Sequence, residues 1–217
     1  TPTSLTSTTT TSITSTSTTP STTTTTQLPI VPLNGAGATF PAPLYTKWFD
    51  EYNKITGIKI NYQAVGSGAG INQITAGTVD FGASDGIMTD AQVTAAQSAG
   101  GPILHIPMTI GPVAIVYSLP FLDTTQLKLT GDVLAKIYLK QITKWNDPAI
   151  LALNPGMERV DAPIAVVHRS DSSGTTYIFT NYLSKVSSDW ATKVGNATAV
   201  NWPGDIGCTG SHTNSVI

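Results

Sequence analysis

The sequence predicts an α/β fold with a mainly parallel sheet, and two observations support this prediction. From Leu33 onward, strand-like and helix-like segments alternate along the chain. Glycines and small polar residues stand at several points where a strand-like run passes into a helix-like one. Ligands bind parallel sheets beyond the carboxyl ends of the strands, so these junctions are candidate binding positions.

The first elements in chain order are a turn and a helix. Residues 35–40 are small and are expected to form a turn. The segment after them is expected to be an amphipathic helix that ends at Gly57, where glycine favours a helix end. Its large apolar residues recur at helical spacing on one face, and they are Leu44, Trp48, Tyr52 and Ile55.

The next elements continue the alternation. Residues 66–70 are rich in glycine and open a short helix, and Thr89 or Asp90 is expected to cap another helix that runs to Ser98. Strands are predicted at residues 58–65, 79–83, 103–106 and 113–117. Residues 31–117 are therefore expected to form a first lobe.

Residues 118–217 are expected to form a second, incomplete lobe. Residues 127–138 look helical. The apolar run 164–167 leads into Arg169, which is followed by small polar residues and glycine at the start of a further helical pattern.

The composition of the chain argues against several classes of function. Residues 1–30 are expected to be a disordered stalk outside the cytoplasm, because the first 26 residues contain 16 Thr and 6 Ser. A net charge of −2 with 11% charged residues argues against a nucleic-acid partner. One cysteine and three histidines without metal-ligand spacing predict no metal and no cofactor.

The loop after Arg169 is a candidate anion site. Arginine offers a planar fork of donors, and free N–H groups at a helix start favour an anion. The loop has no lysine and no G-x-x-x-x-G-K-[ST] pattern, which excludes a nucleotide P-loop. Taken alone, the loop is equally typical of an ordinary capped helix beside a surface arginine.

Three further junctions carry related groups: Thr39 and Ser67 offer hydroxyls, and Asp85 offers a carboxylate. A carboxylate repels an anion unless that anion has a proton to donate. Monohydrogen phosphate has such a proton near neutral pH and sulfate does not, so Asp85 is expected to act as a filter.

These motifs resemble a known family, the phosphate-binding (PstS-like) solute-binding proteins of ABC phosphate importers. The similarity is carried in order by GAGATFPAPLY at residues 35–45, VDFGASD at 79–85, KWND at 144–147 and AVVHR at 165–169 with SGT at 173–175. It implies a two-lobed, type II periplasmic-binding-protein-like fold that closes on phosphate between its lobes.

The resemblance also implies roles for individual residues. Asp85 would accept the proton of the phosphate, Phe40 would donate its backbone N–H, and Asp171 would orient Arg169. The full set of implied phosphate-binding residues is Thr39, Phe40, Ser67, Asp85, Arg169, Ser173, Gly174 and Thr175. The implied protein is a monomer without enzymatic activity that delivers phosphate to the membrane permease of an ABC importer, from the periplasm or the cell surface.

The end of the chain departs from the family. After Trp202 and Pro203 the family continues with strands that return to both lobes, whereas this sequence stops at Ile217. We therefore expect a truncated chain that binds phosphate poorly. Three alternatives stay open: a secreted phosphatase with Ser67 or Ser173 as its nucleophile, a cell-surface adhesion protein, and a binding protein for another tetrahedral oxyanion.

Overall fold

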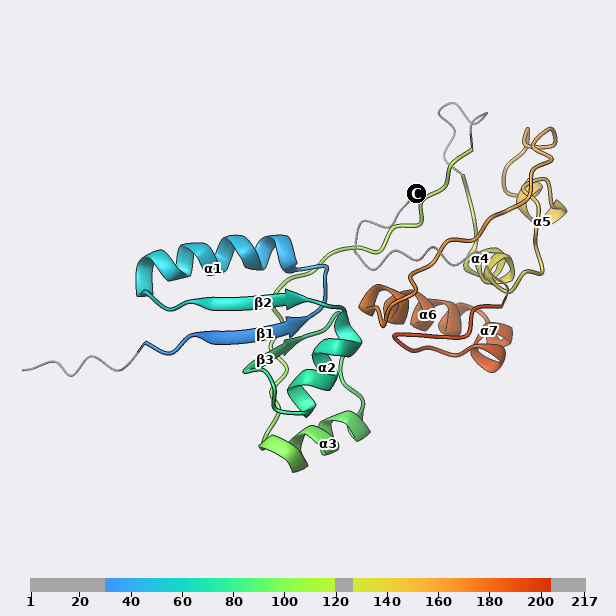
Figure 1. Cartoon of the computed structure of the whole chain (residues 1–217). Helices are drawn as coiled ribbons and strands as arrows, with labels where there is room; N and C mark the ends of the chain where they lie inside the picture. The colour runs from blue at the N-terminus through green and yellow to red at the C-terminus, as the bar shows by residue number, and fades with distance from the viewer. Residues whose placement is uncertain (1–29, 120–126, 204–217) are drawn as a thin grey trace, which may run out of the picture.

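A computed structural model describes residues 30–119 and 127–203 of the chain, and the predicted stalk lies almost entirely outside this range. Two groups of elements are joined by residues 101–119 (Figure 1). We call the group from β1 to α3 the first lobe and the group from α4 to α7 the second lobe. The predicted boundary at residues 117 and 118 stays a prediction.

A three-stranded parallel sheet organises the first lobe, with strand order β2-β1-β3. The strands are β1 at Leu33–Gly37, β2 at Ile60–Ala64 and β3 at Phe81–Ala83. The predicted strands at residues 58–65 and 79–83 are therefore confirmed, with shorter bounds.

The predicted turn at residues 35–40 is wrong in its first half, because residues 35–37 belong to the central strand β1. Small residues serve packing here rather than turning the chain. A Cβ on Gly35 would overlap the ring of Phe81, and one on Gly37 would lie 2.8 Å from the backbone nitrogen of Ala83. Gly37 also has a φ of 143°, which side-chain-bearing residues rarely adopt.

Helix α1, Ala42–Thr56, covers one face of the sheet, while α2 and α3 lie on the other side (Figure 1). It ends as predicted, with Gly57 in the left-handed region at a φ of 75°. The face that packs on the sheet carries Tyr45 and Phe49, and the rings of Tyr45 and Tyr62 stand nearly perpendicular with their centroids 5.2 Å apart.

The apolar stripe predicted on α1 does not face the sheet. Ile55 is 82% exposed, and Leu44, Trp48 and Tyr52 are also exposed. A shift of one residue along a helix rotates a side chain by about 100°. The aromatic rings at Tyr45 and Phe49 occupy the sheet side and leave the neighbouring stripe on the outside.

Helices α2, Ser67–Thr75, and α3, Asp90–Gly100, agree with the predicted helices. Thr89 rather than Asp90 caps α3. Its hydroxyl accepts a hydrogen bond from the Gln92 N–H, and the Gln92 side chain accepts one from the Thr89 N–H. This is a complete capping box.

The strands predicted at residues 103–106 and 113–117 are wrong, since residues 102–119 contain no strand. A strand needs a neighbouring strand for its backbone hydrogen bonds. This segment instead runs from α3 across to the second lobe (Figure 1), and Leu104 and Ile110 are 82% and 96% exposed.

The second lobe is helical in the part of it that the structure describes. Its helices are α4 at Gly131–Tyr138, α5 at Pro148–Leu151, α6 at Gly174–Val186 and α7 at Ser188–Lys193. The predicted helix at residues 127–138 begins later, because the Thr130 hydroxyl caps it by accepting from the Val133 N–H.

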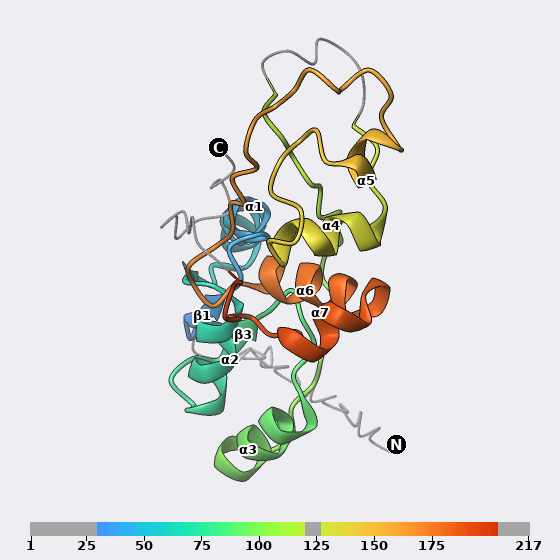
Figure 2. The same cartoon turned by 90° about the vertical axis from the view of Figure 1, so that its right-hand side faces the viewer.

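Two apolar clusters share α4. Val133 and Ile137 pack with Ile164 and Val166 of the apolar run that leads to Arg169. Leu134 packs on the other side with a cluster from α6 and α7, whose buried members include Phe179, Leu183 and Trp190. Helix α4 thus holds the segment before Arg169 and the helix after it in one lobe (Figure 2).

Candidate anion-binding site

The carboxyl ends of the three strands lie side by side in the first lobe. The Gly37 carbonyl accepts hydrogen bonds from the N–H groups of Val65 at 3.0 Å and Gly66 at 2.9 Å. The Ala38 N–H donates to the Ala83 carbonyl at 2.8 Å. These bonds bring together the loops after the strands, which carry Thr39, Ser67 and Asp85.

Ser67 and Asp85 are in direct contact. The Asp85 N–H donates to Ser67 Oγ at 3.2 Å, and Ser67 is fully buried as the first residue of α2. Thr39 is also buried. The first lobe therefore presents two buried hydroxyls and one carboxylate at the start of a helix.

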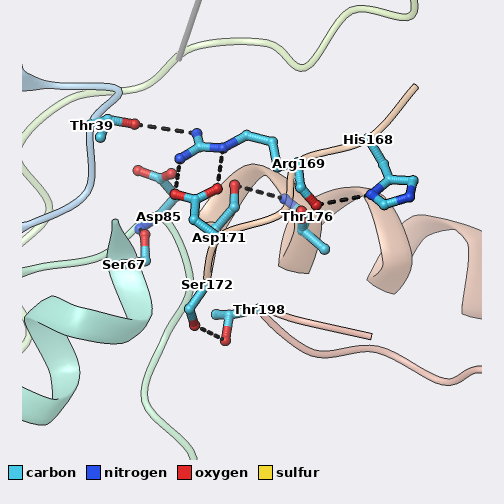
Figure 3. A network of polar contacts seen from close by, with 10 residues as sticks. Thr39, Ser67, Asp85, His168, Arg169, Asp171, Ser172, Thr176 and Thr198 are labelled. Atoms are coloured by element: carbon cyan, nitrogen blue, oxygen red, sulfur yellow. Dashed lines mark hydrogen bonds and ion pairs between the residues drawn. The ribbon is translucent and has the colours of Figure 1, made fainter. Parts of the chain in front are cut away.

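Arg169 connects the two lobes. Its side chain is only 11% exposed, and its Nη1 donates to Thr39 Oγ1 at 3.2 Å (Figure 3). Its Nε donates to Asp171 Oδ1 at 2.7 Å, and its Nη2 contacts Asp171 Oδ2. The expected orientation of Arg169 by Asp171 is thus present as a two-point contact, which fixes the plane of the guanidinium group.

Helix α6 begins against the first lobe. Its N-cap is Ser173, which is fully buried and whose Oγ accepts from the Thr176 N–H at 3.3 Å. A Cβ on Gly174 would overlap Ser67 Oγ and would lie 2.6 Å from the Cβ of Asp85. The first turns of α2 and α6 therefore approach each other closely, and both supply the positive end of a helix dipole.

The carboxyl of Asp85 has a pKa raised above its ordinary value. Partial burial raises it most, while the positive charge of Arg169 and a hydrogen bond from Ser67 lower it. Burial disfavours the charged form because the protein solvates it less well than water does. A carboxylate in this setting is a suitable acceptor for a proton carried by a ligand.

The contacts link most of the residues that the sequence predicts for the site. Arg169 is bonded to Thr39, while Ser67, Asp85 and Gly174 lie against one another. The charge of Arg169 acts on Asp85 and links the two sets, and Ser173 stands beside them as the N-cap of α6. Phe40 and Thr175 lie at the margin of this group. Phe40 follows Thr39 and is 42% exposed, with its ring close to Gly111, and Thr175 is half-buried in the first turn of α6.

Sequence reasoning missed two contacts beside this group, although Ser172 lies in the predicted donor loop and Gly68 in the predicted helix start. The Gly68 N–H donates to the Ser172 carbonyl at 3.1 Å, and Ser172 Oγ donates to Thr198 Oγ1 at 2.8 Å. No pattern in the sequence signals these pairs, because they join residues far apart in the chain.

Residues 30–119 and 127–203 contain neither a candidate metal cluster nor a helix that could span a membrane. This part of the chain contains no cluster of three or more His, Cys, Asp or Glu side chains that could hold a metal ion. None of its helices is both long and apolar enough to cross a membrane.

Comparison with known proteins identifies the family. The model of the PBP superfamily domain matches residues 6–214. The phosphate-binding protein PstS of Xylella fastidiosa strain Temecula1 is 49% identical over 181 residues, which are 83% of this chain and 48% of that protein. PstS of Pasteurella multocida is 52% identical over 171 residues, 79% of this chain and 48% of that protein.

A solved structure from Clostridium perfringens supports the fold. It is assigned as a phosphate ABC transporter substrate-binding protein and contains bound phosphate. It is 20% identical to this chain, with a TM-score of 0.50. The match covers 74% of this chain and 58% of the solved chain. The chain spans about half the length of the curated relatives it matches. On the family match and these identities, the chain belongs to the PBP superfamily and is a PstS-like member of it.

Proposed function

We propose that this chain captures inorganic phosphate, as the monohydrogen anion, between its two lobes. The observation that carries the proposal is the approach of Arg169 and the first turn of α6 to Thr39, Ser67 and Asp85 of the first lobe. The relatives named phosphate-binding protein PstS and the Clostridium perfringens structure with bound phosphate support the same ligand.

Donors from both lobes would supply the affinity. Arg169 carries the charge, and the N–H groups of Ser67 at the start of α2 and of Gly174 and Thr175 at the start of α6 add donors. Charge-assisted hydrogen bonds of this kind are stronger than neutral ones, especially where water is excluded. Thr39, Phe40, Ser67, Asp85, Arg169, Ser173, Gly174 and Thr175 are the proposed phosphate contacts.

Asp85 would supply the selectivity. Its carboxylate accepts the proton of monohydrogen phosphate, whereas the fully ionised sulfate meets only repulsion. The other donors do not distinguish the two tetrahedral anions. Selectivity for phosphate over sulfate therefore depends on this one side chain.

Isothermal titration calorimetry with phosphate and with sulfate near pH 7.5 tests the proposal. We expect heat on titration with phosphate and none with sulfate. Arg169→Met should weaken phosphate binding by roughly tenfold to a hundredfold, as expected for hydrogen bonds to a charged group. Arg159→Met is the matched control, because Arg159 is the other arginine of the chain and is exposed.

Three outcomes of the titrations bear on the proposal. Equal binding of both anions, or equal phosphate binding by the Arg169 and Arg159 variants, would contradict it. The absence of phosphate binding by the unaltered chain would contradict it for this chain. Asp85→Asn should reduce the preference for phosphate over sulfate.

We further propose that the chain acts outside the cytoplasm, tethered through its Ser/Thr-rich stalk, as a monomer that delivers phosphate to an ABC permease. The proposed role is capture without bond-making, so no catalytic residue is assigned. Unchanged chromogenic phosphate esters after incubation with the purified chain would support this, and their turnover would favour a phosphatase.

A further inference from the structure

A direct backbone contact joins the lobes beside the anion-binding residues. The N–H of Gly68, in the first turn of α2, donates to the carbonyl of Ser172 at 3.1 Å. Ser172 belongs to the second lobe and precedes the N-cap of α6. Neither residue is among the proposed phosphate contacts.

The contact depends on the absence of a side chain at position 68. A Cβ on Gly68 would lie 2.6 Å from the Cβ of Ser172 and would overlap its hydroxyl. Gly66, with a φ of 91°, is similarly close, since a Cβ there would lie 2.9 Å from the Ser172 carbonyl oxygen. The first turn of α2 and the Ser172 segment therefore fit together with no room for a methyl group.

Thr198 holds Ser172 from the side of the second lobe. Ser172 Oγ donates to Thr198 Oγ1 at 2.8 Å, and the Ser173 N–H donates to the Thr198 carbonyl at 2.8 Å. Figure 3 shows the Ser172–Thr198 pair apart from the cluster around Arg169. This pair fixes the carbonyl that accepts from Gly68.

We infer that Gly68, Ser172 and Thr198 form a closure latch, a set of contacts that favours the closed arrangement of the lobes without touching the anion. The consequence for affinity rests on the proposed phosphate-binding function. If only the closed arrangement binds tightly, the apparent affinity is reduced by the fraction of molecules that are open. Gly68, Ser172 and Thr198 are thus positioning residues for phosphate capture.

Gly68→Ala with Gly100→Ala as its matched control tests the latch. Both glycines lie in helices, and alanine favours a helix over glycine. The two sites differ in space, because a Cβ on Gly100 meets nothing within 4 Å. Loss of closure in the Gly68 variant alone would therefore reflect the contact with Ser172.

The inter-lobe distance is the first readout. Spin labels at Lys54→Cys on α1 and Lys193→Cys on α7, in a Cys208→Ser background, report the separation of the lobes in the full chain. We expect Gly68→Ala to shift the distance distribution to longer values and Gly100→Ala to leave it unchanged. Thr198→Val, which removes the hydroxyl that accepts from Ser172, should give a smaller shift in the same direction.

Phosphate affinity is the second readout, measured by calorimetry. Gly68→Ala should weaken binding roughly tenfold or more, as expected for loss of a hydrogen bond together with a steric clash. Unchanged inter-lobe distances in both Gly68→Ala and Thr198→Val would overturn the inference, whatever their phosphate affinity. Changed distances with unchanged affinity would also overturn it. If the unaltered chain does not bind phosphate, the proposed function fails and the distances alone decide the latch.

Discussion

Arg169→Met is expected to destabilise the chain strongly, apart from any effect on a ligand. The substitution keeps an unbranched side chain of similar length and removes the charge. It leaves Asp171, which is 19% exposed, without its two-point partner, and it removes the donor to Thr39. It also removes the positive charge that stabilises the Asp85 carboxylate.

The size of this loss of stability depends on how deeply the Arg169–Asp171 ion pair is buried. Removing one partner of a fully buried ion pair costs about 3–5 kcal/mol, whereas exposed pairs are worth about 0–1 kcal/mol. Because Arg169 is 11% exposed and Asp171 is 19% exposed, we expect a loss of about 2–4 kcal/mol in the free energy of unfolding. That is a large share of the roughly 5–15 kcal/mol that stabilises a folded domain.

The cost should depend on pH in a defined direction. Arg169 lowers the pKa of Asp85, so its removal raises that pKa further above the unfolded value. A raised carboxyl pKa destabilises the folded state as pH rises from the unfolded pKa through the folded pKa. The cost of Arg169→Met should therefore be largest at neutral pH and smaller near pH 4.

Urea denaturation near pH 7 and pH 4, followed by tryptophan fluorescence, measures both effects. With a denaturant slope of about 2 kcal/mol per molar, the midpoint at neutral pH should fall by about 1–2 M urea. The exposed control Arg159→Met should stay within about 0.5 kcal/mol of the unaltered chain. A loss no larger than that of the control would refute the reasoning, and an equal loss at both pH values would refute its Asp85 part.

Two further predictions concern Asp85 and Trp190. Asp85→Asn should raise the melting temperature at neutral pH, because it removes a carboxylate whose pKa burial raises. The gain should shrink as the pH falls and disappear below about pH 3, where the carboxyl is protonated in both states. A lower melting temperature at pH 7 would contradict this. Trp190→Ala should cost about 3–5 kcal/mol in urea denaturation, since Trp190 is fully buried and its Nε1 donates to the Gly195 carbonyl at 2.9 Å. Trp48→Ala, at a 41% exposed site, should cost less than about 1 kcal/mol, and equal costs would show that burial is not the cause.

The sequence by itself determined the α/β class and most helix boundaries of the first lobe. These boundaries depend on interactions between residues a few positions apart. Gly57 ends α1 because it adopts a left-handed φ, and Thr89 starts α3 because its hydroxyl reaches the Gln92 N–H. The sequence also predicted Arg169 and Asp85 as site residues, from their residue types and their places at the junctions of elements.

Only the tertiary structure decided which apolar residues of α1 face the sheet and that residues 102–119 form no strand. Both outcomes depend on partners far away in the chain. The same holds for the bond from Arg169 to Thr39 across 130 positions and for the contact of Gly68 with Ser172. The spacing of residues along the chain predicts which of them share one face of a helix or strand. Which neighbour each face contacts depends on the tertiary packing.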